Sequence, residues 1–207
     1  MSPPYATRLL VRHAMVVPLK DFTEAKSRLR QGGLRGVESL VQDLAASVMA
    51  SCAPHPTFVL TESDDVDDFA QRQGWSVLRS PRAGLNAASQ WAFGQLRNVF
   101  ERVTFVHGDI RYPAGIASMR ITADVMIVPD HHGVGTTILS LPSHPAFRIR
   151  FGPGSARAHA REAETQGLSW AFLTPSPWSL DIDVPSDLRP HNGESEGGNP
   201  PSLSDWL

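Results

Sequence analysis

Residues 17–29 read V-P-L-K-D-F-T-E-A-K-S-R-L, and this stretch indicates the fold class better than any other in the chain. The run before it, residues 8–17, is rich in Leu and Val and predicts a first β-strand, while residues 23–30 predict a short helix. Between and within these elements lie three cations, Lys20, Lys26 and Arg28. A strand that ends in a basic loop at the start of a helix is where α/β proteins bind phosphate. The stretch therefore predicts an α/β fold with a phosphate site after its first strand.

Strand-like and helix-like segments continue to alternate beyond this stretch. The pattern predicts strands over residues 57–61, 76–78, 102–106, 124–128, 136–140, 146–151 and 169–173. It predicts helices over residues 34–49, 65–73, 84–100 and 155–166. Such alternation implies a mostly parallel sheet covered on both faces. Four polar residues follow predicted strand ends, where such sheets bind ligands: Lys20, Thr61, Asp109 and Asp130.

Composition limits the class of protein. With 207 residues, 41% of them hydrophobic, the chain can bury one good core, so residues 1–188 are expected to form one domain. Residues 189–207 are rich in Pro, Gly, Ser and Glu and are expected to lack fixed structure. The net charge of −2 gives no support for a nucleic-acid or membrane partner. One cysteine, Cys52, and no long apolar run favour a cytoplasmic protein, with Cys52 as a core residue and the oligomeric state undetermined.

Asp181 and Asp183 predict a metal site. At positions i and i+2 of an extended segment their carboxylates point to the same side, where like charges repel unless a cation lies between them. Asp109, at the end of another strand, could supply a third oxygen to Mg²⁺. The alternative is that Asp181 lies in a turn and Asp183 caps a helix that starts near Pro185.

Three Gly-containing turns can place donors beside an anion, although ordinary turns explain each of them equally well. They are residues 84–86 (G-L-N), 133–137 (G-V-G-T-T) and 151–155 (F-G-P-G-S). Asn86 could bind a sugar or base, or serve as a local cap. Zinc is disfavoured, since His107, His131 and His132 match no common ligand spacing.

Taken together and in order, these segments resemble the 2-phospho-L-lactate guanylyltransferase family of coenzyme F-420 biosynthesis. The resemblance covers roughly residues 8–188 and is most specific at residues 25–29 (A-K-S-R-L) and 151–155 (F-G-P-G-S). It implies a three-layer, Rossmann-like nucleotidyltransferase fold similar to that of the molybdopterin guanylyltransferases. It also implies transfer of GMP from GTP to 2-phospho-L-lactate, phosphoenolpyruvate or 3-phosphoglycerate, with release of pyrophosphate and with a downstream deazaflavin-transferring enzyme as a partner.

The resemblance assigns a role to each site residue. Mg²⁺ would be held by Asp109, Asp181 and Asp183, and the catalytic residues would be Lys20, Lys26, Arg28 and Asp109. The nucleotide would be bound by Pro18, Lys20, Lys26, Thr61 and Asn86. The acceptor would be bound by Thr136, Thr137, Gly152 and Ser155.

The chain departs from the family pattern at three places. The usual A-D-L-P turn is replaced by residues 108–113, G-D-I-R-Y-P, while Thr137 replaces Asn and Val184 replaces Thr. The altered turn leaves the acceptor and the nucleotide open. Two alternatives follow: a related nucleotidyltransferase with another acceptor, or a nucleotide- or phosphometabolite-binding protein that has lost catalysis. All three aspartates are present, which argues against the second.

Overall fold

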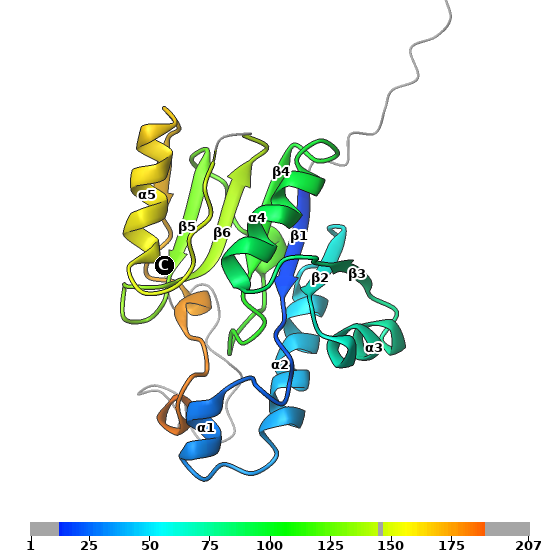
Figure 1. Ribbon diagram of the computed structural model, residues 1–207. Coiled ribbons are helices and arrows are strands. Elements are labelled where there is room, and N and C mark those ends of the chain that lie inside the picture. Colours follow the sequence, from blue (N-terminus) through cyan, green and yellow to red (C-terminus); the bar gives the residue numbers. More distant parts are fainter. Residues whose placement is uncertain (1–12, 145–146, 189–207) are drawn as a thin grey trace, which may run out of the picture.

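The computed structural model describes residues 13–144 and 147–188, which fold around a seven-stranded sheet (Figure 1). The strand order is β3-β2-β1-β4-β6-β5-β7. The strands are β1 (His13–Pro18), β2 (Thr57–Thr61), β3 (Ser76–Arg79), β4 (Arg102–Val106), β5 (Val125–Pro129), β6 (Thr136–Pro142) and β7 (Trp170–Phe172). The α-helices are α1 (Ser27–Gln31), α2 (Val37–Ser51), α3 (Asp64–Arg72), α4 (Leu85–Leu96) and α5 (Ser155–Thr165). Short 3₁₀ helices span η1 (Ile116–Ser118), η2 (Pro177–Ser179) and η3 (Pro185–Leu188).

The sheet is parallel except at β6. Strand β1 pairs in parallel with both β2 and β4, and β5 pairs in parallel with β7, whereas β6 runs antiparallel between β4 and β5. The carboxyl ends of β1, β2 and β4 therefore lie at one edge, and the inverted β6 begins at that same edge. This geometry confirms the predicted α/β class with a mostly parallel sheet, and it brings segments distant in sequence together at one edge.

Two hydrophobic cores make the fold three-layered. One face of the sheet packs against α2 and α3, with Met15 and Val17 of β1 buried beneath them. The other face packs against α4 and α5, with Ala14 and Val16 pointing that way. Side chains alternate between faces along a strand, so a continuous apolar strand supplies both cores. Figure 1 shows α4 and α5 on the near side of the sheet.

Two predicted elements were wrong. The helix expected over residues 23–30 begins only at Ser27, because Lys26 adopts a left-handed backbone conformation (φ 56°, ψ 46°) that interrupts it. The strand expected over residues 146–151 is absent from residues 147–151, where side chains replace a partner strand. Gln90 accepts from the Ile149 amide at 2.9 Å, and Asn86 accepts from the Phe151 amide at 2.6 Å.

The other predicted elements are present, with ends shifted by a few residues. Residues 8–12 and 145–146 and the segment 189–207 lie outside the described residues, so the predicted start of the first strand and the predicted tail stay predictions. Cys52 is buried, and burial raises the pKa of its thiol to about 12, as suits a core residue. Within the described ranges, no helix is long and apolar enough to cross a bilayer.

Candidate active site

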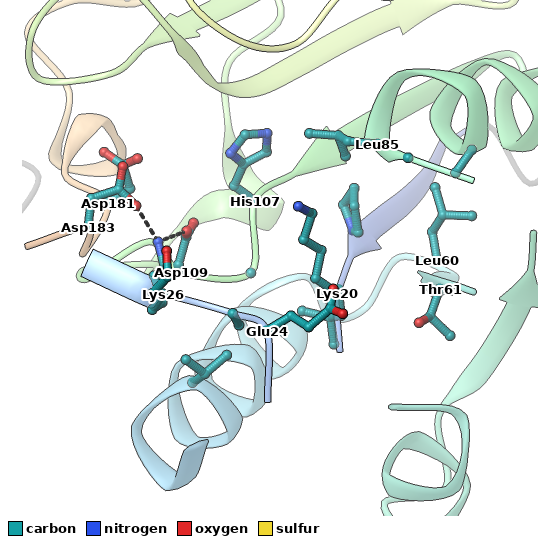
Figure 2. A pocket seen from close by; sticks show the side chains of 18 of the residues that line it. Lys20, Glu24, Lys26, Leu60, Thr61, Leu85, His107, Asp109, Asp181 and Asp183 are labelled. Atoms are coloured by element: carbon teal, nitrogen blue, oxygen red, sulfur yellow. Dashed lines mark hydrogen bonds and ion pairs between the residues drawn. The ribbon is translucent and has the colours of Figure 1, made fainter. Parts of the chain in front are cut away.

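A cavity of about 470 Å³ lies at the carboxyl ends of β1, β2 and β4 (Figure 2). Its wall includes most of the residues predicted to bind phosphate, nucleotide or metal: Pro18, Lys20, Lys26, Arg28, Thr61, Asp109, Asp181 and Asp183. His107, Glu62 and Leu85 also line it. The structure thus gathers residues from five separate segments of the sequence around one space large enough for a small ligand.

Three carboxylates meet at one end of this cavity. Asp109 follows β4, and the segment that carries Asp181 and Asp183 runs antiparallel beside it, with the Ile182 amide bonded to the Asp109 carbonyl at 3.2 Å. Ile182 turns into the core, so Asp181 and Asp183 face the same side as predicted. One oxygen from each carboxylate lies within 4.8 Å of the others, and this trio is the only candidate metal group among the described residues.

The electrostatics of the trio fit a cation. Burial, together with the neighbouring carboxylates of Asp109 and Asp183, raises the pKa of Asp181 to about 6. Asp109 has one buried oxygen, Oδ1, with no hydrogen-bond partner in the described structure. An unsatisfied buried carboxylate oxygen and mutually repelling acids are what a hard divalent cation would relieve, so these residues fit Mg²⁺.

Lys26 supplies the positive charge that the trio meets in this structure. Its Nζ donates to Asp109 Oδ2 and, at 2.6 Å, to Asp183 Oδ1, and its side chain is only 10% exposed (Figure 2). Burial alone would lower the pKa of Lys26, but the two carboxylates outweigh it and raise that pKa. Burial alone would raise the pKa of Asp109, but Lys26 and His107 hold it below its usual value. A left-handed conformation costs a non-glycine residue on the order of 1–2 kcal/mol, and these contacts help to hold it.

Two residues outside the predicted site brace the basic loop. Asp21 accepts from the Thr23 amide at 2.8 Å and from the Ser63 hydroxyl at 2.9 Å, which ties the loop to the end of β2. Arg30 donates to the Phe22 carbonyl at 2.6 Å. The Thr23 amide is therefore already hydrogen-bonded within the loop. Lys20 and Arg28 are exposed on the cavity wall and have no ion-pair partner in the described structure.

The predicted acceptor residues form a separate cluster that does not line the cavity. The Ser155 hydroxyl donates to Thr136 Oγ1 at 2.9 Å, and Thr137 donates to the Val128 carbonyl at 3.3 Å. Gly152 has a φ of +118°, in the region that favours glycine. The structure brings these four residues together at the start of β6 and α5, and their roles in acceptor binding stay predictions.

His159 joins this cluster and was not singled out from the sequence. Its Nδ1 lies 3.3 Å from Thr136 Oγ1, and its Nε2 accepts from the Arg150 amide at 3.0 Å. Because Nε2 is an acceptor, Nδ1 carries the proton and donates to Thr136. Burial lowers the pKa of His159 to about 4, with the nearby His107 adding to the effect. No residue pattern marked it, since a lone histidine on a helix carries no spacing signal.

Asn86 is not among the residues that line the cavity, and the N-cap residue of α4 is Gly84. The side-chain amide of Asn86 accepts from the Phe151 amide and donates to the Phe151 carbonyl at 3.1 Å. It therefore attaches the segment before the F-G-P-G-S turn to the start of α4, and nucleotide binding by Asn86 stays a prediction.

Asp187 holds the turn that carries Asp183, and this bears on the alternative that Asp183 caps the helix near Pro185. Asp187 Oδ2 accepts from the Asp183 and Val184 amides, each at 2.8 Å. The side chain that caps the backbone amides of this turn is therefore that of Asp187 and not that of Asp183. The spacing from Asp183 to Asp187 on either side of a proline is a signal that sequence analysis could have used.

His107, His131 and His132, for which zinc was disfavoured, belong to no candidate metal group among the described residues. The rings of His131 and His132 lie beside each other, tilted by 44° with centroids 3.8 Å apart, where an extended chain would have turned them to opposite sides. They lie in the loop between β5 and β6, which Asp130 closes by accepting from the Val134 and Gly135 amides. His131 Nδ1 lies 3.5 Å from Asp181 Oδ1, at the edge of the acidic trio.

Solved structures share the fold of this chain. A nucleotidyl transferase from Methanothermobacter thermautotroptrophicus superposes with a TM-score of 0.60 at 15% identity, covering 85% of this chain and 94% of that one. The 4-diphosphocytidyl-2C-methyl-D-erythritol synthase of Anaerococcus prevotii superposes with a TM-score of 0.58 at 7% identity, covering 85% and 94%. The chain thus shares its three-layer fold with these two enzymes. The chain belongs to the family described as guanylyl transferase CofC like, whose model matches residues 13–191.

Curated relatives carry names within that family. The chain is 29% identical over 187 residues to the phosphoenolpyruvate guanylyltransferase of Conexibacter woesei, covering 84% of each chain. It is 27% identical to the 3-phospho-D-glycerate guanylyltransferase of Phenylobacterium zucineum, covering 73% of this chain and 74% of the relative. It is 22% identical to the 2-phospho-L-lactate guanylyltransferase of Methanocaldococcus vulcanius, covering 84% and 81%. The protein is thus an enzyme of the guanylyltransferase class.

Proposed function

We propose that this enzyme transfers GMP from GTP to a phosphorylated three-carbon acid and releases pyrophosphate. The single observation that carries the proposal is the meeting of Lys20, Lys26 and Arg28 with the acidic trio in one cavity at the carboxyl edge of the sheet. The cations on the cavity wall suit a triphosphate, and the three carboxylates suit a metal shared with phosphates. The names of the relatives above support the acceptor class.

In the proposed reaction a phosphate oxygen of the acceptor attacks the α-phosphorus of GTP. The new P–O bond joins GMP to the acceptor, and the bond to the β-phosphate breaks, so pyrophosphate leaves with that bridging oxygen. A substrate phosphate is already ionised, so the step needs alignment and charge neutralisation more than a base. Mg²⁺ bound by Asp109, Asp181 and Asp183 would neutralise phosphate charge and orient the reacting oxygens.

The residues of the chain divide the remaining work. Lys20 and Arg28 would bind the triphosphate, with Pro18 and Thr61 on the adjoining wall. Thr136, Thr137, Gly152 and Ser155 would bind the acceptor, provided that their mutual hydrogen bonds open toward it. By the family resemblance we place the enzyme in coenzyme F-420 biosynthesis, where a deazaflavin-transferring enzyme would consume the product. The chain's single cysteine favours the cytoplasm.

The test is pyrophosphate release by the purified protein with GTP and Mg²⁺. Phosphoenolpyruvate, 2-phospho-L-lactate and 3-phosphoglycerate are supplied separately, and ATP or CTP replaces GTP as the nucleotide control. We expect release with GTP and one of the three acids, which also names the acceptor. Absence of release with all three, by a protein that still binds GTP, would contradict the proposed acceptor class.

Asp183→Asn provides the matched test of the metal site. The change keeps the side-chain size but removes one of three charges, so we expect turnover to fall at least about 100-fold with the fold intact. Asp64→Asn, at a surface ion pair with Arg79, is the control and should keep full turnover. Activity close to wild type in Asp183→Asn would contradict the assignment of Asp183 as a ligand of Mg²⁺.

A further inference from the structure

Lys26 is the one cation that contacts the acidic trio through two ion pairs in the described structure. Its Nζ donates to Asp109 Oδ2 and to Asp183 Oδ1, and both oxygens belong to carboxylates that would bind a divalent cation. An ammonium group and a divalent cation repel each other strongly at such distances. A divalent cation bound by the three carboxylates would therefore lie beside this ammonium group and repel it.

The other basic residues of the cavity do not share this arrangement. Lys20 lines the same cavity, is exposed, and has no ion pair or hydrogen bond with a described residue. Lys26 is almost covered and is held in a left-handed backbone conformation, the only non-glycine residue of the described chain with a positive φ. Strained conformations persist where surrounding contacts fix them, and they concentrate at switch points.

We propose that Lys26 is an internal counter-ion that holds the three carboxylates together before a divalent cation binds, and that cation binding releases its ammonium group into the cavity. The inference rests on the metal site of the proposed function. It adds a competition between one side chain and the cation. Because the released ammonium joins Lys20 and Arg28 in the cavity, cation and triphosphate should each strengthen binding of the other.

The first test measures Mn²⁺ affinity by calorimetry, without nucleotide or acceptor, in wild type, Lys26→Met and Lys20→Met. Both variants lose one positive charge from the same cavity, but only Lys26→Met removes the competitor. We expect Lys26→Met to bind Mn²⁺ at least about tenfold more tightly than wild type, and Lys20→Met to stay within about threefold. Equal or weaker binding in Lys26→Met would overturn the inference, and so would an equal gain in both variants.

The second test uses wild-type protein and so does not depend on how a variant folds. The chain contains only two lysines, Lys20 and Lys26, so limited acetylation followed by peptide mass spectrometry follows each one separately. Without cation, Lys26 should react several-fold more slowly than Lys20. Mn²⁺ should raise the rate at Lys26 and leave Lys20 unchanged. An unchanged or slower rate at Lys26 with bound Mn²⁺ would contradict the release.

These outcomes separate the inference from the proposed function. Neither test measures turnover. If the wild-type protein transfers GMP but Lys26→Met binds Mn²⁺ no more tightly than wild type, the counter-ion role is wrong and the proposed activity still holds. A protein that binds no Mn²⁺ in any form would remove the counter-ion role and, with it, the metal part of the proposed function.

Discussion

At the scale of single residues, the position of a metal-binding carboxylate depends on a neighbour that binds no metal. Asp187 is nearly buried and accepts two backbone amides of the turn that carries Asp183. Arg111 in turn donates to the Asp187 carbonyl at 2.6 Å, which attaches the turn to the segment after Asp109. The carboxylates of the trio are therefore aligned through backbone contacts, and not only by their own strands.

Asp187→Ala should disturb the trio without removing a ligand. Leaving the Asp183 and Val184 amides without an acceptor is expected to lower the free energy of unfolding by about 1–3 kcal/mol and to weaken Mn²⁺ binding. Urea unfolding and calorimetry measure the two effects. Asp64→Ala, which removes an exposed carboxylate, should change stability by less than about 1 kcal/mol and leave Mn²⁺ binding alone. Unchanged Mn²⁺ affinity in Asp187→Ala would contradict the positioning role.

At the scale of elements, the segment before the F-G-P-G-S turn is held by side chains of α4 in place of strand pairing. Gln90 donates to the Phe147 carbonyl at 3.1 Å and accepts from the Ile149 amide, and Asn86 binds both backbone groups of Phe151. Buried backbone groups must find partners, and amide side chains supply them here. Helix α4 thus fixes the approach to the predicted acceptor cluster.

Asn86→Ala should loosen residues 147–151, because it removes both hydrogen bonds to the Phe151 backbone. We expect a loss of about 1–3 kcal/mol in the free energy of unfolding and a rise in the KM for the acceptor larger than that for GTP. Asn86→Asp is the matched control, because it keeps the acceptor for the Phe151 amide and should lose less in both measurements. A variant whose KM rises only for GTP would instead support nucleotide binding by Asn86.

Sequence patterns predicted this architecture well because alternating apolar runs and strand-end polar residues are local signals. The strand ends placed Lys20, Thr61 and Asp109 at one cavity, and the i, i+2 spacing put Asp181 and Asp183 on one side. What the patterns missed depends on contacts between distant residues. Residues 147–151 have the apolar pattern of a strand, but their backbone amides bind the side chains of Gln90 and Asn86 and not a neighbouring strand. The ion pairs of Lys26 and the bonds of His159 are equally long-range.

At the scale of the whole molecule, buried neutral histidines link stability to pH. Burial lowers the pKa of His13 to about 4, with His55 and Arg102 adding to the effect, and His159 is lowered to a similar value. His13 lies in a polar chain through the sheet, with Nε2 2.6 Å from Thr104 Oγ1, which donates to Ser140 at 2.7 Å. The unfolded chain binds protons at these two histidines more readily than the folded chain. Their contribution to the free energy of unfolding is therefore fully present above about pH 6.5 and is lost as the pH drops toward 4.

His159→Gln isolates one contribution to this pH dependence. Urea unfolding of wild type and variant at pH 7.5 and pH 4.5 should show a larger loss in wild type, by up to about 2 kcal/mol, because the variant has no ring to protonate at this site. Comparing the difference between the proteins cancels the titration of carboxylates common to both. Parallel losses in the two proteins would show that His159 does not titrate in this range.

The loop between β5 and β6 has a consequence for how such an enzyme can change its substrate. Asp130 closes residues 130–135 by its own hydrogen bonds, and the loop joins the carboxyl end of β5 directly to the start of the antiparallel β6, without a crossover helix. The loop is therefore a self-contained turn beside the trio, with His131 next to Asp181. We expect it to be exchangeable as a unit between relatives named for different acids, so that acceptor choice could diverge while the nucleotide-facing half of the enzyme stays constant.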